Sequence, residues 1–104
     1  MHYVVLASHA AEICPTSNAK TKALLLEVVP QIPALADKHG VKILAGPYAN
    51  REHMVVVIVE TERAEGLDAF LVESRLAQWN QVRLLPSVPL DEGIREIEDA
   101  VPLF

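Results

Sequence analysis

The stretch Glu52–Glu60 constrains the fold of this chain more than any other segment. Successive side chains of a β-strand point to opposite faces. The stretch therefore divides into two sets, His53, Val55, Val57, Val59 and Met54, Val56, Ile58, Glu60. Both sets are apolar at the centre, which is typical of a strand that is covered on both sides. Both faces of this strand therefore need a cover.

Three further strands are predicted, because residues 2–9, 41–45 and 81–85 are each rich in β-branched or apolar side chains. The first of them is again apolar at the centre of both faces. Residues 46–51, Gly-Pro-Tyr-Ala-Asn-Arg, are rich in turn formers and predict a loop between the second strand and the third.

A helix is expected to fill the chain between the first two strands. Thr16, Ser17 and Asn18 offer three successive N-caps for its start. Pro30 and Pro33 fall inside its pattern, and each lacks a backbone donor, so we expect a break near Val29. The run Lys38-His39-Gly40, with cations before a glycine, is typical of a helix end.

Two more helices are predicted in the second half of the chain. Thr61 can cap one of them, whose inner face would hold Leu67, Phe70, Leu71 and Ser74. Asp91 can cap the last helix, in which Ile94, Ile97 and Val101 recur at helical spacing. The apolar run 101–104 that follows predicts docking against another surface.

The order strand, helix, strand, strand, helix, strand predicts an α+β fold. With right-handed crossovers and one hairpin it becomes the ferredoxin-like βαββαβ sandwich, with an antiparallel sheet in the order 4-1-3-2 and an added C-terminal helix. A length of 104 residues fits one domain spanning residues 1–104. Helices would cover one face of the sheet and leave the other open.

The open face of this sheet should itself be apolar, and 51% of the chain is hydrophobic. Burying about 500 Å² of such a face contributes on the order of 12 kcal/mol before the costs of association. We therefore expect a homodimer stacked through the sheet faces. The alternative is that the last helix and Phe104 cover the face within one chain.

Composition argues against several classes of partner. A net charge of −5 without a Lys/Arg cluster disfavours nucleic acid. The longest apolar runs fall short of the ~20 residues of a membrane-spanning helix, and residues 1–3 do not begin a signal peptide, so no membrane partner is expected. The single cysteine cannot form an internal disulfide, which favours a reducing cytoplasm.

Side chains that can bind a metal ion or take part in thiol chemistry are expected to meet at one end of the sheet. In antiparallel neighbours the end of the first strand lies beside the start of the third, so His9 and His53 come to the same edge. Cys14, the only cysteine, precedes the first helix at that edge. Tyr48 and Trp79 are expected to line a ligand pocket there, although each is also a common packing aromatic.

Imidazole with thiolate suits zinc or copper, and three ligands would leave one coordination position open. The metal ligands predicted in this way are His9, Cys14 and His53. His9 and Cys14 are also the candidate catalytic residues, because a thiol near a helix N-terminus and an imidazole has a lowered pKa. The structural alternatives are a cysteine packed as a small apolar residue and histidines bonded to backbone carbonyls.

The segment Leu44-Ala45-Gly46-Pro47-Tyr48, with the strand Met54–Glu60 and the helix Glu65–Glu73, resembles the dimeric α+β barrel superfamily. The likeness is greatest to its YCII-like group, in which a Gly-Pro turn follows the second strand. It covers about residues 41–75 and implies a ferredoxin-like protomer and a sheet-to-sheet dimer.

The superfamily includes monooxygenases, haem-dependent enzymes, isomerases and ligand-binding proteins, so the resemblance does not select one activity. YCII-like proteins are associated with a His–Asp pair. His9 stands near the end of the first strand, but no aspartate lies near the predicted edge, and His9–Asn18 departs from the pattern.

Three functions follow as hypotheses. The first is a protein that binds a metal ion or small ligand through its His/Cys site. The second is a small enzyme, of the monooxygenase or isomerase kind or thiol-dependent, that uses Cys14 with a histidine base. The third is an accessory dimer without chemistry. The chain has no phosphate-binding glycine loop, Gly-x-Ser-x-Gly elbow or His-Glu-x-x-His motif.

Overall fold

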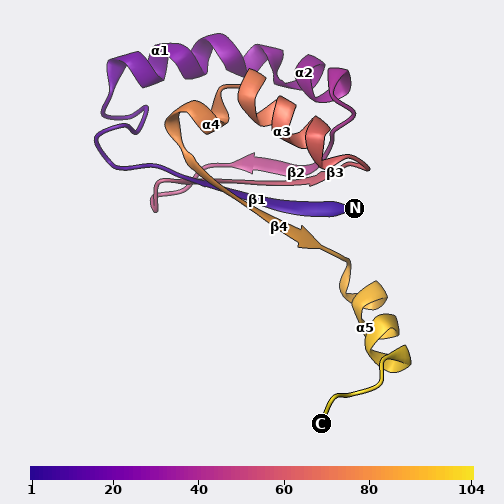
Figure 1. Cartoon of the computed structure of the whole chain (residues 1–104). Coiled ribbons are helices and arrows are strands. Elements are labelled where there is room, and N and C mark those ends of the chain that lie inside the picture. Colours follow the sequence, from indigo (N-terminus) through magenta and orange to yellow (C-terminus); the bar gives the residue numbers. More distant parts are fainter.

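The chain folds into a sheet with helices packed on one face, and one further helix stands apart (Figure 1). The structure is a computed structural model that describes residues 1–104. Its elements, in chain order, are β1 (His2–Ser8), α1 (Ala19–Val28), η1 (Val29–Gln31), α2 (Ile32–Lys38), β2 (Lys42–Tyr48), β3 (Met54–Glu60), α3 (Ala64–Glu73), α4 (Leu76–Trp79), β4 (Gln81–Ser87) and α5 (Leu90–Asp99).

The four strands form one sheet in the order β2-β3-β1-β4, with antiparallel neighbours throughout. Read from the other edge this is 4-1-3-2. The α+β class is confirmed, and the arrangement is consistent with a ferredoxin-like sandwich. Because β1 is paired along its whole length with β3, Ser8 lies opposite Met54 at one end and His2 opposite Glu60 at the other.

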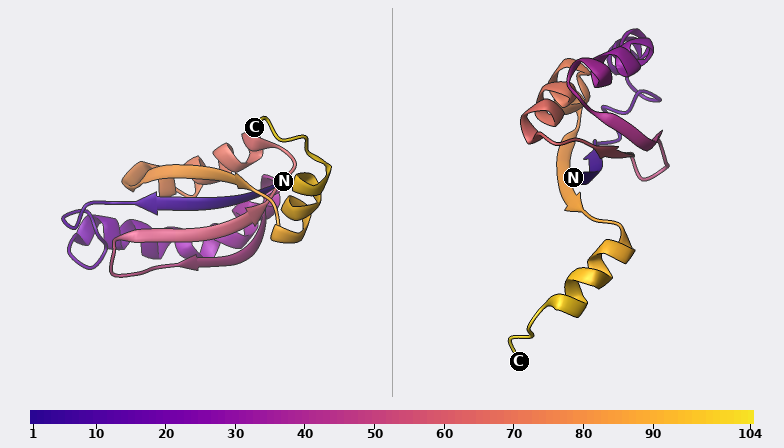
Figure 2. Two further views of the ribbon diagram at one scale, coloured as in Figure 1. Left: turned by 90° about the horizontal axis from the view of Figure 1, so that it is seen from below. Right: turned by 90° about the vertical axis from the view of Figure 1, so that its right-hand side faces the viewer.

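The core lies between the sheet and the helices above it (Figures 1 and 2). Val5 lies directly opposite Val57, and both are buried. The core cluster consists of Val5, Ala36, Val41, Val57, Val59, Leu67, Phe70 and Leu71. One of the two alternating sets of β3 therefore faces the helices, as the pattern predicted, and the other set faces the open side.

The first helical region is broken where its prolines predicted a break. α1 ends at Val28, the turn η1 follows, and α2 begins at Ile32. Asn18 is the N-cap of α1, because its Oδ1 accepts a hydrogen bond of 3.0 Å from the backbone N–H of Thr21. Gly40, at a φ of +69°, follows the end of α2 as predicted.

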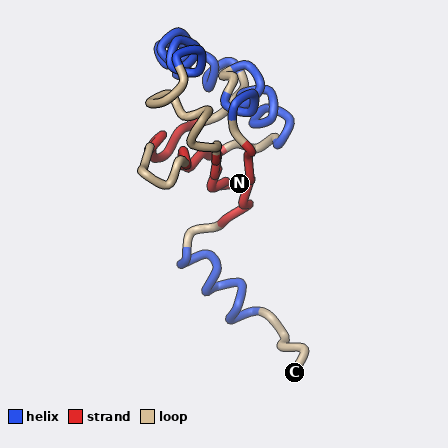
Figure 3. The backbone as a smooth tube through the Cα atoms, turned by 90° about the vertical axis from the view of Figure 1, so that its left-hand side faces the viewer, coloured by secondary structure: helices blue, strands red, loops and turns tan.

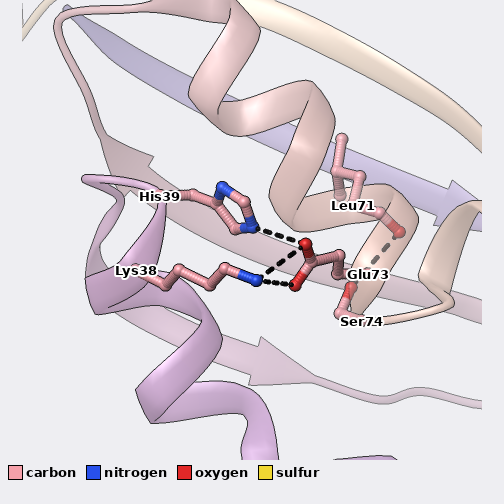
Figure 4. A network of polar contacts seen from close by, with 5 residues as sticks. All are labelled: Lys38, His39, Leu71, Glu73 and Ser74. Atoms are coloured by element: carbon pink, nitrogen blue, oxygen red, sulfur yellow. Dashed lines mark hydrogen bonds and ion pairs between the residues drawn. The ribbon is translucent and has the colours of Figure 1, made fainter.

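α2 and α3 are joined by a small polar network (Figure 4). Lys38 Nζ lies 3.0 and 3.1 Å from the two carboxylate oxygens of Glu73. His39 Nε2 lies 3.3 Å from Glu73 Oε1, a charge contact that lacks the geometry of a directed hydrogen bond. Lys38 first, and His39 second, hold the pKa of Glu73 below its ordinary value.

β2 is longer than expected, because it continues through residues 46–48 that were predicted as a loop. Pairing with β3 extends through the turn formers: Ala45 lies opposite Ile58, and Tyr48 opposite Val56, with register shifts between them. Gly46 makes this irregular path feasible. Its φ is +85°, and a Cβ on it would lie 2.7 Å from the carbonyl oxygen of Val56.

The later helix starts also differ from the predictions. α3 begins at Ala64 with Arg63 as N-cap, whereas Thr61 Oγ1 accepts the N–H of Arg63 in the preceding turn. α4 was not predicted; Arg75, at a φ of +64°, separates it from α3. α5 begins at Leu90, so Asp91 lies in its first turn and is not its cap.

α5 leaves the sheet at the end of β4 and leads away from the body (Figures 1 and 3). Leu90, Ile97 and Phe104 are exposed. The alternative in which the last helix and Phe104 cover the open sheet face within one chain is therefore wrong for this structure. No helix of the chain combines the length and the apolar character that crossing a bilayer requires.

Candidate metal centre

The two predicted histidines meet where β1 ends and β3 begins. Ser8 is paired with Met54, and in the next position the backbone N–H of His9 donates a 3.0 Å hydrogen bond to the carbonyl oxygen of His53. The centroids of the two imidazole rings lie 5.6 Å apart at an interplanar angle of 69°. The antiparallel register thus brings together residues that are distant in the sequence.

Cys14 reaches the histidines from the loop between β1 and α1. Its N–H donates to the carbonyl oxygen of Ala11, and its own carbonyl oxygen accepts from Ser17 and Asn18. These turns fold the loop back over the sheet end and bury Cys14. One ring nitrogen from each histidine and the Cys14 Sγ all lie within 4.8 Å of one another. The structure therefore brings all three predicted ligands together.

Asn80, the residue just before β4, determines which ring nitrogen of neutral His9 carries the proton. Its side-chain N–H donates to the carbonyl oxygen of Leu76 at 3.0 Å, so its Oδ1 is the atom that faces His9. His9 Nδ1 lies 2.9 Å from that Oδ1 and must be the donor, because Oδ1 can only accept. In the neutral ring the proton is therefore on Nδ1, and Nε2 carries a free lone pair.

The free nitrogen of His9 is buried and has no hydrogen-bond partner in the chain. Buried polar atoms of native proteins are almost always satisfied, so an unpartnered one requires an explanation. Metal-binding histidines commonly donate their second N–H to a carbonyl or carboxylate oxygen, which orients the ring. The hydrogen bond from His9 Nδ1 to the Asn80 Oδ1 is an interaction of this kind.

The Cys14 thiol is held in surroundings that favour its anion. Thr16 contributes most, through its hydroxyl at 3.0 Å from Sγ and through its backbone N–H. The side chains of His9 and His53 add to this when the ring nitrogen that faces Sγ carries a proton, which for His9 is the imidazolium form. Burial opposes them. Together these groups lower the pKa of the Cys14 thiol to about 6, from an ordinary value of 9.0. The thiolate, which is the metal-binding and nucleophilic form, therefore predominates at neutral pH.

His53 adopts a left-handed backbone conformation, with a φ of +57°. Such a conformation is uncommon for a residue other than glycine and costs free energy. Asn50 supports it from the preceding turn, because its Oδ1 accepts hydrogen bonds from the N–H groups of Glu52 and Met54, at 3.0 and 3.4 Å. The turn thus holds the His53 imidazole at the sheet end beside His9.

Of the two predicted pocket aromatics, the structure places one at the cluster. The Trp79 ring centroid lies 4.9 Å from that of His9, with the planes tilted by 48°. Trp79 also lines a shallow groove of about 540 Å³, together with Ile13, Asn18, Lys20, Thr21, Gln78, Asn80 and Gln81. Tyr48 is 60% exposed, lies opposite Val56 and does not line this groove.

Sequence reasoning missed two residues that support the cluster. Thr16 was considered only as a helix cap, and no sequence pattern marks Asn80 as a partner of His9. A hint lay in their positions, because Thr16 is two residues from the cysteine and Asn80 adjoins the start of β4 at the same sheet edge.

The comparisons with known proteins add no assignment. No protein-family model matches this chain, and no curated protein matches it. The chemistry of the His9–Cys14–His53 cluster is therefore the basis on which function can be argued.

Proposed function

We propose that this protein binds a transition metal ion, zinc or copper, through His9, Cys14 and His53. The observation that carries the proposal is the buried Nε2 of His9, which has no partner and belongs to a cluster with a thiolate and a second imidazole. Two imidazoles and a thiolate form a ligand set that suits these metals better than magnesium or calcium, which prefer oxygen.

The spacing of the ligand atoms supports this proposal. Zn–N and Zn–S bonds of about 2.0–2.1 and 2.3 Å, in tetrahedral geometry, separate the ligand atoms by roughly 3.3–3.6 Å. The three ligand atoms lie within 4.8 Å of one another, so they would have to approach by at most about 1.5 Å to reach these separations. A three-ligand site leaves a fourth position for water or a small ligand.

The same fold supports a proposal about the family. The antiparallel sheet in the order β2-β3-β1-β4, with helices on one face, agrees with a ferredoxin-like protomer of the dimeric α+β barrel kind. The expected aspartate partner of a YCII-like histidine has no counterpart at the cluster, because the side chain that holds His9 is Asn80. We therefore carry over the architecture and not an activity.

A second candidate function is thiol chemistry. Cys14 Sγ lies within 4.8 Å of a ring nitrogen of each imidazole, and the Thr16 hydroxyl, 3.0 Å from Sγ, can donate to its anion. Cys14 would then be the nucleophile, and His9 or His53 the base. The two candidates differ in what the resting protein holds at the cluster, a metal ion or a free thiolate.

Metal analysis of protein purified without an affinity tag tests the first candidate. We expect about one zinc or copper ion per chain in the wild type and a loss of most of it in His9→Gln and Cys14→Ala. His2→Gln is the matched control, because His2 lies at the opposite end of the same strand and contacts Glu60. Substoichiometric metal in the wild type, or equal loading of Cys14→Ala, would contradict metal binding.

Alkylation of Cys14 separates the two candidates. A bound metal should protect the thiol, and removal of the metal with a chelator should restore its reaction with iodoacetamide. If Cys14 in the protein as purified reacts rapidly and no metal is found, the thiol candidate is favoured.

Asn80→Leu adds a test of how the metal is held. This change leaves the three ligands in place but removes the acceptor that orients His9. Loss of such a partner typically weakens metal binding 10–100-fold. We expect that loss in a titration with zinc, with an unchanged circular dichroism spectrum.

A further inference from the structure

The chain carries an apolar arm that covers nothing in its own body. The arm consists of α5 and residues 100–104, and it stands clear of the body in Figure 1, in the right-hand view of Figure 2 and in Figure 3. Leu90, Ile94 and Ile97 recur at the spacing i, i+4, i+7, so they line one side of α5. Leu90 is 78% exposed and Ile97 73% exposed. An apolar stripe of this kind does not stabilise a helix that is surrounded by water.

The accessible surface of the chain is too large for a compact monomer. It measures 7343 Å², whereas a compact protein of 11.4 kDa exposes about 5,800 Å². The radius of gyration, 16.0 Å, likewise exceeds the value of about 13 Å for a compact chain of this length. The excess surface is roughly 1,500 Å², more than the ~800 Å² that each partner buries in a typical stable dimer.

Each copy also has an apolar surface of matching character. On the sheet face away from the helices, Leu6 lies opposite Val56 and Val4 lies opposite Ile58. Leu85 extends this surface onto β4. No element of the same chain covers it, so each copy has one apolar arm and one open apolar sheet face (Figure 2).

The charges of the arm and of the open sheet face are also complementary. The polar sides of α5 are mainly acidic, with Asp91, Glu92, Glu96, Glu98 and Asp99 against the single cation Arg95. Arg83 lies on the open sheet face opposite Leu6 and forms no ion pair within the chain. An arm laid on this face would bring acidic side chains toward Arg83.

We propose that the arm of each copy packs on the open sheet face of a second copy, which gives a two-fold dimer with exchanged arms. Two-fold symmetry suits these surfaces, because each copy gives one arm and receives one. This contact is separate from the proposed metal site. β4 starts beside Ser8 at the metal end of the sheet and finishes opposite His2, so the arm leaves from the other end.

The mass of the protein in solution provides the first test. We expect twice the chain mass of 11.4 kDa by sedimentation or light scattering at micromolar concentration. The double variant Ile94→Glu with Ile97→Glu should weaken the dimer at least 100-fold, because it places charges on the stripe. The control, Arg95→Gln, changes the polar side of the same helix but neither the apolar stripe nor the acidic side chains, and it should remain dimeric.

Cross-linking shows whether the arm reaches another chain. In a Cys14→Ser background, a ¹⁵N-labelled chain with Ile97→Cys is mixed with an unlabelled chain with Ile58→Cys and oxidised. We expect disulfide-linked peptides that pair labelled position 97 with unlabelled position 58. Mixing with Glu98→Cys in place of Ile97→Cys should greatly reduce the yield.

Three results would overturn the proposal. The first is a monomeric wild type at high micromolar concentration. The second is a dimer that persists unchanged in the Ile94→Glu/Ile97→Glu variant, which would place the contact elsewhere. The third is the absence of a disulfide between the mixed chains, while a separate variant that carries both Ile58→Cys and Ile97→Cys forms one within the chain, which would mean that the arm folds back on its own sheet. None of these results depends on metal at the His9–Cys14–His53 cluster.

Discussion

At the scale of single residues, the chemistry of the His9–Cys14–His53 cluster depends on two neighbours that are not ligands. Thr16 stabilises the Cys14 anion through its hydroxyl and its backbone N–H. Asn80 holds the proton of His9 on Nδ1 and so leaves Nε2 free. These two neighbours therefore favour the thiolate of Cys14 and the neutral-ring tautomer of His9 with Nε2 free, which are the forms that bind a metal.

The first prediction concerns the reactivity of Cys14. Because its pKa is lowered to about 6, the alkylation rate of the metal-free protein should rise through about pH 6 and level off before pH 8. Thr16→Ala should move the midpoint to higher pH, whereas Ser17→Ala should leave it in place. A wild-type midpoint near the ordinary thiol pKa of 9.0 would show that the anion is not stabilised.

A second prediction concerns the backbone of β2. Gly46→Ala forces a residue with a Cβ into a φ of +85° and toward the Val56 carbonyl oxygen, so we expect it to destabilise the fold by about 1–3 kcal/mol. Gly40→Ala is the matched comparison, because Gly40 has a φ of +69° but no atom near its Cβ position. Urea denaturation should show the smaller loss for Gly40→Ala; equal losses would mean that the contact with Val56 is unimportant.

At the scale of elements, strands were easier to predict than helix ends. The run Met54–Glu60 is continuously apolar and rich in β-branched residues, which predicts a strand, and one of its two apolar faces is the one that the helices cover. Helix starts depend on single hydrogen bonds: Asn18 caps α1, whereas Thr61 bonds to Arg63 in the turn ahead of α3. A capping residue type therefore indicates a nearby start but does not fix its position.

A third prediction tests the contact between α2 and α3. Glu73→Gln should destabilise the protein at pH 7, because it removes the ion pair with Lys38 and the contact with His39. The pKa of Glu73 is lowered in the folded state, so its contribution is fully present above the ordinary value of 4.5 and is lost as the pH falls through the lower, folded value.

Thermal unfolding at several pH values measures this effect. The difference between wild type and Glu73→Gln should shrink below pH 4.5, whereas Glu27→Gln, which removes a carboxylate without an ion pair, should behave like the wild type throughout. A Glu73→Gln difference that grows in acid would have the wrong sign for this pair.

At the scale of the whole molecule, the proposed metal would join three segments that are separate in the chain. His9 ends β1, Cys14 lies in the loop before α1, and His53 precedes β3. A ligand that binds the folded state alone stabilises it according to its concentration relative to its dissociation constant. Metal binding and global stability should therefore be linked.

The fourth prediction is a thermal shift on metal addition. With free zinc at 100 times its dissociation constant, the stabilisation is about 2.7 kcal/mol. For a domain of this size that corresponds to a rise in Tm of roughly 10–20 °C over the chelator-treated protein. The shift should disappear in Cys14→Ala and persist in His2→Gln. A similar shift in all three proteins would indicate binding elsewhere.

Much of the candidate site could be predicted from the sequence. Once β1 and β3 are antiparallel neighbours, His9 and His53 must come to one sheet edge, and the loop to α1 brings Cys14 there. The role of Asn80 could not be predicted, because it depends on a turn of helix, α4, that the weak pattern of residues 75–80 did not reveal. The pocket role of Tyr48 stays a prediction, because the structure shows this residue 60% exposed at the end of β2, opposite Val56.

The sequence by itself determined the four strands, their order with the longer helices and the edge at which the three ligands gather, because runs of β-branched and apolar residues and the lengths of the connections between them are local properties with few solutions in three dimensions. Only the tertiary structure decided which nitrogen of His9 is free, how Thr16 meets the Cys14 sulfur and where α5 points. These features depend on hydrogen bonds and chain directions that form between distant segments after packing, and no local pattern encodes them.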